Sequence, residues 1–258
     1  MPVILAVAVA VAAFLIAPVI VVVPMSFTAA QSMQFPPPAY SLALYRNYFS
    51  DPEWLLPTVN SIAIAAGTMV LTLCLAIPAG FGLLRSRIRA RAGIDVLLMS
   101  PVMVPLILSA LAYYRFLAPL GLVGTRFGVM LAHTALALPV TLLTLSAGFK
   151  SFDRNLVRAA MSAGAGPLRT FLFVTFPVLR PTILVGALFA FLSSFDETVV
   201  ALFIAGRDAT TLPKKMFQSI RLEADPVISV VSTLLFALVL VILATTALLR
   251  RRNQPHAA

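Results

Sequence analysis

Residues 155–181, NLVRAAMSAGAGPLRTFLFVTFPVLRP, form a polar and basic island in a chain that is otherwise apolar enough for a membrane. Helix-forming residues run from Leu156 to Ala163, and Gly164 and Gly166 then interrupt the helix. Pro167 suits the first turn of a second helix. A simple connection between two membrane spans needs no such pair of helices. We therefore expect another protein to contact this island from the cytoplasm.

The composition of the whole chain indicates an integral membrane protein. Of its 258 residues, 60% are hydrophobic and only 11% are charged, whereas a soluble domain carries about 25% charged residues. At roughly 20 residues per span, the apolar runs fit six membrane helices. We therefore predict an all-α fold with six transmembrane helices, at 2–24, 58–84, 94–117, 127–149, 182–205 and 227–249.

The basic residues predict how the chain is oriented. The net charge is +10, and twelve of the 19 basic residues fall into three clusters on alternate loops, at 85–91, 150–180 and 250–252. Lys and Arg collect on the cytoplasmic side of membrane proteins. This distribution argues against nucleic acid as a partner. It favours a membrane protein with both termini in the cytoplasm.

The same pattern divides the chain into three parts. Residues 1–56 hold the first helix and an outer loop, residues 57–249 hold a core with the connecting loop at 150–181, and residues 250–258 form a basic tail. The first apolar run lacks a basic leader, which favours an uncleaved helix over a signal peptide. We expect part of the aromatic-rich outer loop to lie at the headgroup layer. A second outer loop, 206–226, contains a predicted amphipathic surface helix.

Two adjacent carboxylates stand out inside the predicted fifth span. A carboxylate in hydrocarbon costs at least roughly 2.5 kcal/mol, so it normally faces a cavity or a partner. Asp196 lies about 21 Å from the cytoplasmic start of this span at 1.5 Å per residue, which places it in the outer half of the bilayer. Two interpretations of Asp196 and Glu197 remain open. They form a cation-attracting position on a translocation route, or they are structural partners of arginines such as Arg115 or Arg207.

Other features of the spans support a transport pathway less directly. Pro101 and Pro105 predict a bent or broken third span, and bends of this kind line cavities in transporters or simply pack. Tyr113 and Tyr114 close this span near the outer interface, and we assign them to the substrate pathway. His133 is expected to be a satisfied interfacial histidine, in preference to a proton relay.

Catalysis finds little support in the sequence. The only cysteine, Cys74, and two histidines, His133 and His256, argue against a disulfide framework or a metal site. The chain contains no HExxH, GxSxG or Walker glycine loop. We therefore predict a non-catalytic chain without an ATP site of its own. A membrane-embedded hydrolase would have to use Asp196, Glu197 and His133.

The island resembles the cytoplasmic loop of the permease subunits of binding-protein-dependent type I ABC importers. The family pattern is Glu-Ala-Ala, three residues, Gly, nine residues, and Ile-x-Leu-Pro. Here the run from Arg158 to Ala160 is followed by Gly164, and nine residues later by the run from Val174 to Pro177. The spacing is kept, and Arg158 replaces the family glutamate. In the family this loop docks into a groove of the ATPase, so the resemblance implies coupling residues Arg158, Ala159, Ala160, Gly164, Gly166 and Pro177.

A second resemblance covers residues 193–235. The stretches SSFDETVVALFIAG, TTLPKKMFQSIRLEADP and VISVVSTLL are similar to the second permease subunit of the spermidine/putrescine (polyamine) branch. This implies a sister permease in a heterodimer, two copies of an ABC ATPase that bind ATP and Mg, and an extracytoplasmic substrate-binding protein. It also implies that Asp196 meets a polycationic substrate. The chain itself is expected to bind no cofactor.

Two alternatives remain from the residues alone. The basic island could be a loop held at the anionic headgroups of membrane lipid, but its small residues, Ala159, Ala160, Ala163 and Gly164, favour close docking of a helix into a protein groove. The chain could also be a stand-alone secondary transporter or channel for small organic solutes. The resemblance favours an importer permease that is driven by separate ATPase subunits.

Overall fold

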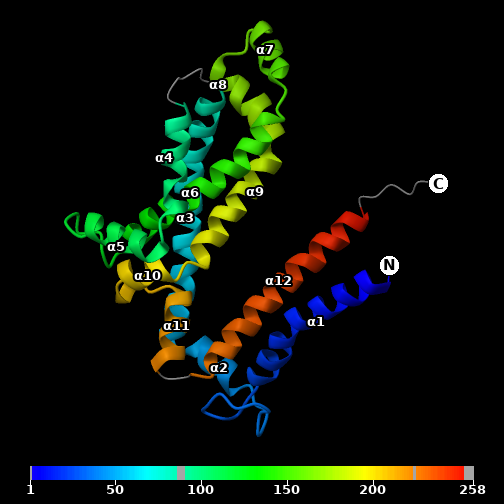
Figure 1. Ribbon diagram of the computed structural model, residues 1–258, viewed down its shortest axis with the longest axis vertical. Helices are drawn as coiled ribbons and strands as arrows, with labels where there is room; N and C mark the ends of the chain where they lie inside the picture. Colours follow the sequence, from blue (N-terminus) through cyan, green and yellow to red (C-terminus); the bar gives the residue numbers. More distant parts are fainter. Residues whose placement is uncertain (1, 86–90, 223–224, 253–258) are drawn as a thin grey trace. The chain divides into compact units, whose positions relative to one another are not determined.

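The computed structural model describes residues 2–85, 91–222 and 225–252 (Figure 1). Every regular element in these ranges is helical, and a single extended bridge pairs Thr28 with Tyr40. The prediction of an all-α fold is confirmed. The contacts divide the chain into two compact units, Met1–Leu55 with Met216–Ala258, and Leu56–Lys215.

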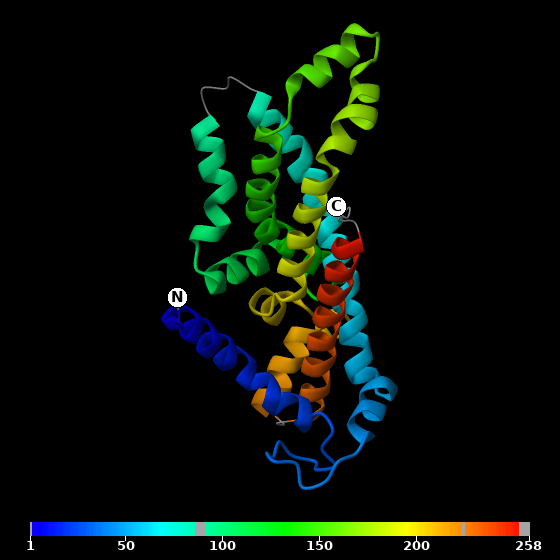
Figure 2. The ribbon, with the colours of Figure 1, turned by 90° about the vertical axis from the view of Figure 1, so that its right-hand side faces the viewer.

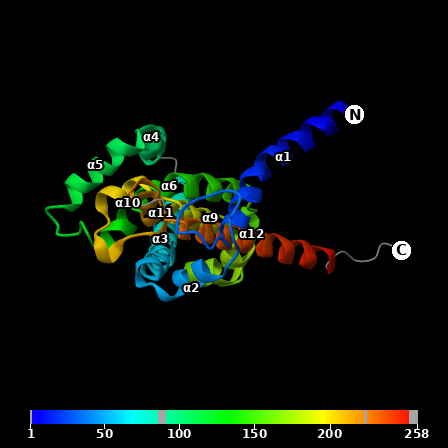
Figure 3. The ribbon, with the colours of Figure 1, turned by 90° about the horizontal axis from the view of Figure 1, so that it is seen from below.

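The first unit is built on two apolar helices, α1 (Pro2–Met25) and α12 (Val227–Arg252), with the short helix α2 (Ala43–Ser50) packed on α12. Figures 2 and 3 show that α1 and α12 are close where the connecting loops begin and diverge toward the chain termini. Ser26 ties α1 to α2, because its Oγ lies 2.8 Å from the Tyr45 hydroxyl. Tyr48 and Trp54 are buried, whereas Tyr40 and Phe49 are 69% and 59% exposed, so the placement of part of this loop at the headgroup layer stays a prediction.

The second unit contains most of α3 (Pro52–Arg85) together with α4 (Arg91–Met103), α5 (Leu106–Leu117), α6 (Arg126–Lys150), α9 (Phe176–Phe195) and α10 (Val199–Ile204). Helices α6 and α9 pack side by side along their length (Figure 2). One buried cluster joins α3, α5, α6 and α10 through Ile64, Ala110, Val129, Val200 and Ile204. A second joins α3, α6 and α9 through Ala76, Leu142, Leu145, Leu179 and Ile183.

The remaining elements are short. α7 (Arg154–Ser162), α8 (Pro167–Thr170) and the π-helical turn η1 (Phe171–Thr175) connect α6 to α9 and lie at one end of the second unit, with α5 and α10 toward the other (Figure 1). The 3₁₀ turn η2 (Arg207–Ala209) follows α10. The predicted amphipathic helix is α11 (Leu212–Leu222). Its Lys214 is buried, and the Nζ donates to the Ala205 carbonyl at 2.6 Å; this burial lowers the Lys214 pKa.

Four helices in the described residues are long and apolar enough to cross a membrane: Ile4–Met25, Pro52–Gly82, Arg126–Lys150 and Pro167–Phe195. The third predicted span is broken, because Val96–Met103 and Leu106–Leu117 meet at 111°. Pro101 lies inside α4 and Pro105 precedes α5, so the predicted break is confirmed. If this bent pair counts as one span, the number of candidate spans rises to five. Val227–Ile242 is a shorter apolar helix. The multi-span fold is therefore present, although the count of six is not reproduced by length alone.

The predicted boundaries of the fifth span, 182–205, are wrong at both ends. Helical structure runs through Pro167–Phe195 and stops before Asp196, and α10 is a separate helix. Ser, Asp and Thr side chains compete with the backbone for hydrogen bonds and favour helix ends. The polar run at 193–198 therefore ends the helix that the surrounding apolar residues suggested would continue. The second span also differs, since α3 starts at Pro52 and not at Thr58.

Candidate functional site

Helix α7 begins with a side-chain cap. The Asp153 carboxylate accepts a hydrogen bond from the Asn155 backbone N–H at 2.9 Å. The first N–H groups of a helix have no partner within the helix, and a carboxylate there also suits the helix dipole. Asp153 therefore fixes where α7 starts, immediately after the end of α6.

The end of α7 is equally well defined. The Ala165 N–H donates to the Ala160 carbonyl and the Gly164 N–H donates to the Met161 carbonyl, both at 3.0 Å. This pair of bonds is the Schellman motif, whose central residue adopts a left-handed conformation. Gly164 has φ of +84°, a value that glycine adopts without the steric penalty of a Cβ. The predicted helix stop at Gly164 is confirmed, and the backbone conformation gives its physical reason.

The residues predicted to dock an ATPase lie on or near this capped helix. Arg158, Ala159, Gly164, Gly166 and Pro177 are exposed, and Ala160 is half-buried. A Cβ placed on Gly164 or on Gly166 would meet no atom within 4 Å. The exposed residues between Arg158 and Gly166 therefore share one short accessible segment. Pro177 lies beyond the η1 turn, in the first turn of α9. The structure contains nothing that tests their role.

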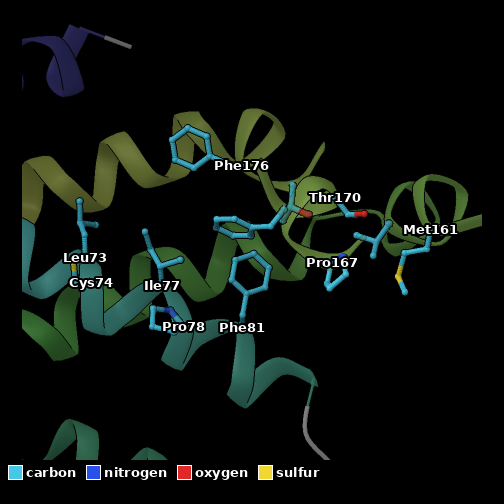
Figure 4. Close-up of a pocket in the computed structure, with 12 residues that line it drawn as sticks. Leu73, Cys74, Ile77, Pro78, Phe81, Met161, Pro167, Thr170 and Phe176 are labelled. Atoms are coloured by element: carbon cyan, nitrogen blue, oxygen red, sulfur yellow. The ribbon is translucent and has the colours of Figure 1, made fainter. Parts of the chain in front are cut away.

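A cavity of about 650 Å³ separates α7 and α8 from the end of α3 (Figure 4). Leu73, Ile77 and Phe81 line it from α3, and Val157 and Met161 line it from α7. The other lining side chains are apolar apart from two threonines. They are Cys74, Pro78, Pro167, Thr170, Phe171, Thr175 and Phe176. This cavity is open to the surface and is not an enclosed void, and the main contacts of α7 are with α8 and η1 and not with α3.

The two carboxylates at 196–197 lie in the break between α9 and α10. Asp196 is exposed, and its N–H still bonds the Leu192 carbonyl at 3.0 Å. Glu197 is half-buried, and its Oε1 accepts from the Val200 N–H at 2.8 Å, which caps the start of α10. In the described ranges neither carboxylate forms an ion pair with Arg115 or Arg207. The structural alternative of arginine partners is thus not realised within the isolated chain.

The predicted pathway tyrosines differ in their surroundings. Tyr113 is half-buried and packs on the cluster that includes Val200 of α10, whereas Tyr114 is 42% exposed. Helices α5 and α10 are in contact, so Tyr113 lies close to the helix that follows the two acids. No hydrogen bond in the described part of the chain joins either tyrosine to Asp196 or Glu197.

A buried row of hydrogen-bonded polar side chains crosses α3, α6 and α9, and it was not predicted from the sequence. His133 Nδ1 lies 2.8 Å from Ser194 Oγ, Ser194 Oγ donates to Thr68 Oγ1 at 3.2 Å, and Thr68 Oγ1 donates to the Met130 carbonyl at 3.5 Å. Because a carbonyl can only accept, the direction of the chain makes His133 Nδ1 the donor to Ser194. His133 Nε2 is then a buried acceptor with no partner among the described residues.

His133 is 1% exposed, so it is buried among the helices of this chain, and its interfacial depth in the membrane stays a prediction. It is satisfied at only one nitrogen. Thr68 and Ser194 are polar residues within apolar runs, and their polarity was the only sequence signal for this row of hydrogen bonds. No group of three or more His, Cys, Asp or Glu side chains that could hold a metal ion occurs among the described residues.

Comparison with known proteins supports a transport role. Residues 90–254 match the family described as "Binding-protein-dependent transport system inner membrane component". The chain is 29% identical over 233 residues to the putrescine transport system permease protein PotI of Escherichia coli K12, covering 88% of this chain and 83% of that protein. It is 24% identical to the spermidine/putrescine transport system permease protein PotC of Haemophilus influenzae, covering 83% of each.

The fold is also similar to a solved structure. That structure is described as a bacterial ABC transporter involved in the import of the acidic polysaccharide alginate, and the match has a TM-score of 0.73. It covers 98% of this chain and 96% of the other at 16% sequence identity. The likeness identifies the ABC importer permease fold, and the family match covers more than half of the sequence. The chain therefore belongs to the family of inner membrane components of binding-protein-dependent transport systems.

Proposed function

We propose that this permease carries a polyamine-like organic cation into the cytoplasm, and that α7 with the turn after it is the contact site for a separate ATPase subunit. The observation that carries the coupling role is the exposure of a well-formed helix. α7 is capped at both ends, yet its Leu156 and Met161 are 42% and 54% exposed. Exposed apolar side chains beside basic ones are typical of a protein interface.

The proposed assembly contains a sister permease, two copies of an ABC ATPase and an extracytoplasmic substrate-binding protein. The family description supports dependence on a binding protein. ATP and Mg would be bound by the ATPase subunits, because this chain carries no nucleotide-binding motif. In this arrangement α7 and both chain termini face the cytoplasm, and the outer segments 31–56 and 206–226 face the binding protein.

The proposed substrate class rests on two relatives and on the charge at the α9–α10 break. The relatives are named for putrescine and spermidine transport, and both compounds are organic cations. Asp196 and Glu197 are adjacent and lack basic partners in the described ranges. Uncompensated carboxylates attract ammonium groups, and carboxylates near membrane spans commonly mark ion pathways. Tyr113 and Tyr114 would offer aromatic faces to the same cation.

The proposed cycle uses α7 as a lever. Closure of the two ATPases around ATP would draw the α7 helices of the paired permeases together. The spans would then rock as rigid bodies and open the pathway toward the binding protein. This step needs no chemistry within the chain. Its residues bind the partner subunits and transmit their movement to the membrane spans.

Reconstitution tests the coupling role. The permease, its sister, the ATPase and the binding protein would be purified together and placed in liposomes, with putrescine uptake measured with and without ATP. We expect uptake only when the ATPase and ATP are both present. Uptake of putrescine by liposomes that contain the permeases alone would overturn the proposal in favour of a stand-alone transporter.

The substrate role is tested on the two acids with the same preparation. Asp196→Asn removes only a charge, because the Asp196 carboxylate makes no side-chain hydrogen bond in the described structure. We expect the maximal putrescine uptake rate at saturating binding protein to fall about tenfold, which corresponds to roughly 1.4 kcal/mol in the barrier. Asp208→Asn, on the exposed η2 turn, is the matched control. Equal rates for wild type and Asp196→Asn would assign Asp196 to a structural role.

A further inference from the structure

The helix that leads from the coupling segment into α9 is irregular at one turn. In η1 the Phe176 N–H donates to the Phe171 carbonyl, five residues earlier, where a regular α-helix would bond residues four apart. Isolated π turns of this kind are uncommon and are found frequently at functional sites. The irregular turn lies between α8 and α9, so any movement of α7 that reaches α9 along the backbone must pass through it.

Phe171, the first residue of this turn, connects it to the membrane helices by a row of aromatic rings. The Phe171 ring centroid lies 5.8 Å from that of Phe81 on α3, with the planes at 77°. Phe81 in turn stacks on Phe149 of α6 at 4.4 Å and 27°. The edge-to-face geometry of Phe171 and Phe81 is a preferred one for aromatic pairs, and the Phe81–Phe149 stack is a closer contact. The row therefore joins η1 to the ends of two helices that are distant from it in sequence.

The α6 side of this row is closely packed. A Cβ placed on Gly80 would lie 2.7 Å from Phe149 Cε2, so the Phe149 ring rests directly against the α3 backbone. Phe149 itself is 7% exposed. A displacement of the Phe81 ring toward α6 therefore meets Phe149 directly, and Phe149 is held against the α3 backbone, because closely packed groups transmit strain.

The α7 side is loosely packed by comparison. α7 makes its main contacts with α8 and η1, and the cavity of about 650 Å³ lies between it and α3. Figure 4 shows Phe81 on the α3 side of this space and Met161 on the α7 side. The contact between Phe171 and Phe81 is thus a direct bridge across a region that is otherwise open.

We propose that Phe171 is a positioning residue that carries the movement of α7 to α3 and α6 through Phe81 and Phe149. This inference rests on the proposed coupling of α7 to an ATPase. The π turn lets the segment tilt without breaking the helix, and the cavity provides the space for that tilt. The aromatic row converts the tilt into a displacement of both helices.

The test uses the complete purified complex with its ATPase and loaded binding protein. Phe171→Ala should leave the amount of co-purified ATPase and the basal ATP hydrolysis unchanged. It should lower the stimulation of hydrolysis by loaded binding protein about fivefold, the scale expected for loss of an aromatic pair. Phe173→Ala is the matched control, because Phe173 lies in the same π turn and is 77% exposed. That control should retain wild-type stimulation.

A double-mutant cycle separates transmission from general loosening. If Phe81 and Phe171 act in one row, Phe81→Ala should show the same loss, and the double variant should be no worse than either single variant. Wild-type stimulation in Phe171→Ala, an equal loss in Phe173→Ala, or additive losses in the double variant would overturn the inference. Failure of the wild-type permease to co-purify with any ATPase would instead overturn the proposed coupling function itself.

Discussion

The two ends of the 56–215 unit are packed in opposite ways. At the α10 end, buried side chains fasten separate segments together: Asn60 Nδ2 donates to the Asp208 and Thr210 carbonyls at 3.0 and 2.9 Å, and Ser61 Oγ accepts from the Leu212 N–H at 2.7 Å. At the α7 end, the helix satisfies its own caps and rests beside a cavity. The difference is consistent with the proposed role of α7 as a lever attached to a more firmly packed body.

This contrast predicts where substitutions act. Changes at the α10 end should reduce the stability of the fold, because they leave buried polar groups without partners. Changes on α7 should leave stability nearly unchanged and alter coupling, because a segment with few buried contacts contributes little to global stability.

Asn60→Leu should be the most damaging. It removes the donors that satisfy two backbone carbonyls and places a larger apolar side chain at a position that is 0% exposed. We expect a loss of about 3 kcal/mol, seen as a lower midpoint in thermal unfolding of the detergent-purified protein. Thr144→Val, at a half-buried threonine on α6 that bonds its own helix, is the control. If the unfolding midpoint of Asn60→Leu shifts no more than that of Thr144→Val, the proposal that the α10 end is firmly packed is wrong.

His133→Leu should have the next largest effect. It leaves Ser194 Oγ without its donor in the buried chain that joins α3, α6 and α9, at a cost of about 2 kcal/mol. The effect should be smaller than for Asn60→Leu, because Asn60→Leu leaves two backbone carbonyls without their donor, whereas His133→Leu leaves only one hydroxyl without its donor. Each substitution also removes one buried atom that has no partner in the described structure, Asn60 Oδ1 or His133 Nε2. The same unfolding measurement checks the order. An unchanged midpoint would show that the polar chain does not stabilise the unit.

Asp153→Ala should act on α7 alone. It removes the side-chain cap on the Asn155 N–H, and caps of this kind stabilise a helix by about 1 kcal/mol. We expect faster amide hydrogen exchange in residues 154–162 with no change in the unfolding midpoint. Asp153→Ser retains a capping oxygen and should restore slow exchange. A general increase in exchange across α6 and α9 would contradict the separation of the lever from the rigid body.

Arg158→Glu should have the smallest effect on stability, below about 0.5 kcal/mol. Arg158 is exposed, and no ion pair of its side chain occurs in the described part of the chain. The variant introduces the glutamate of the family pattern, so ATPase co-purification and uptake should be retained. Loss of the ATPase from this variant would show that Arg158 itself makes an essential contact that the pattern does not contain.

The sequence was sufficient for the features that depend on local chemistry. The apolar runs predicted the helices, Gly164 predicted the end of α7, and Pro101 with Pro105 predicted the break between α4 and α5. Features that depend on tertiary packing were not predictable. The row of Phe81, Phe149 and Phe171 and the bond from His133 to Ser194 join residues that are distant in sequence, and hydrophobic periodicity carries no information on such pairs.

The two carboxylates also show what the sequence could and could not predict. Asp196 and Glu197 were correctly singled out as unusual, but their placement inside a continuous span was wrong. The apolar residues on either side obscured the helix-ending tendency of the short polar run between Ser193 and Thr198. The assignment of the domain boundaries at residues 56 and 249, and of all the site residues, stays a prediction.

The central claim is that a separate ATPase drives this permease through α7, and Gly164 allows the most direct measurement. Gly164 has φ of +84° and open space around it, so Gly164→Leu disturbs the capped turn and its surface without a clash inside the chain. Gly164→Asn, which tolerates the left-handed conformation, is the matched control. We predict that the Gly164→Leu complex inserts in the membrane normally but loses the stimulation of ATP hydrolysis by loaded binding protein, while the control keeps most of it. Normal stimulation in Gly164→Leu would contradict the account.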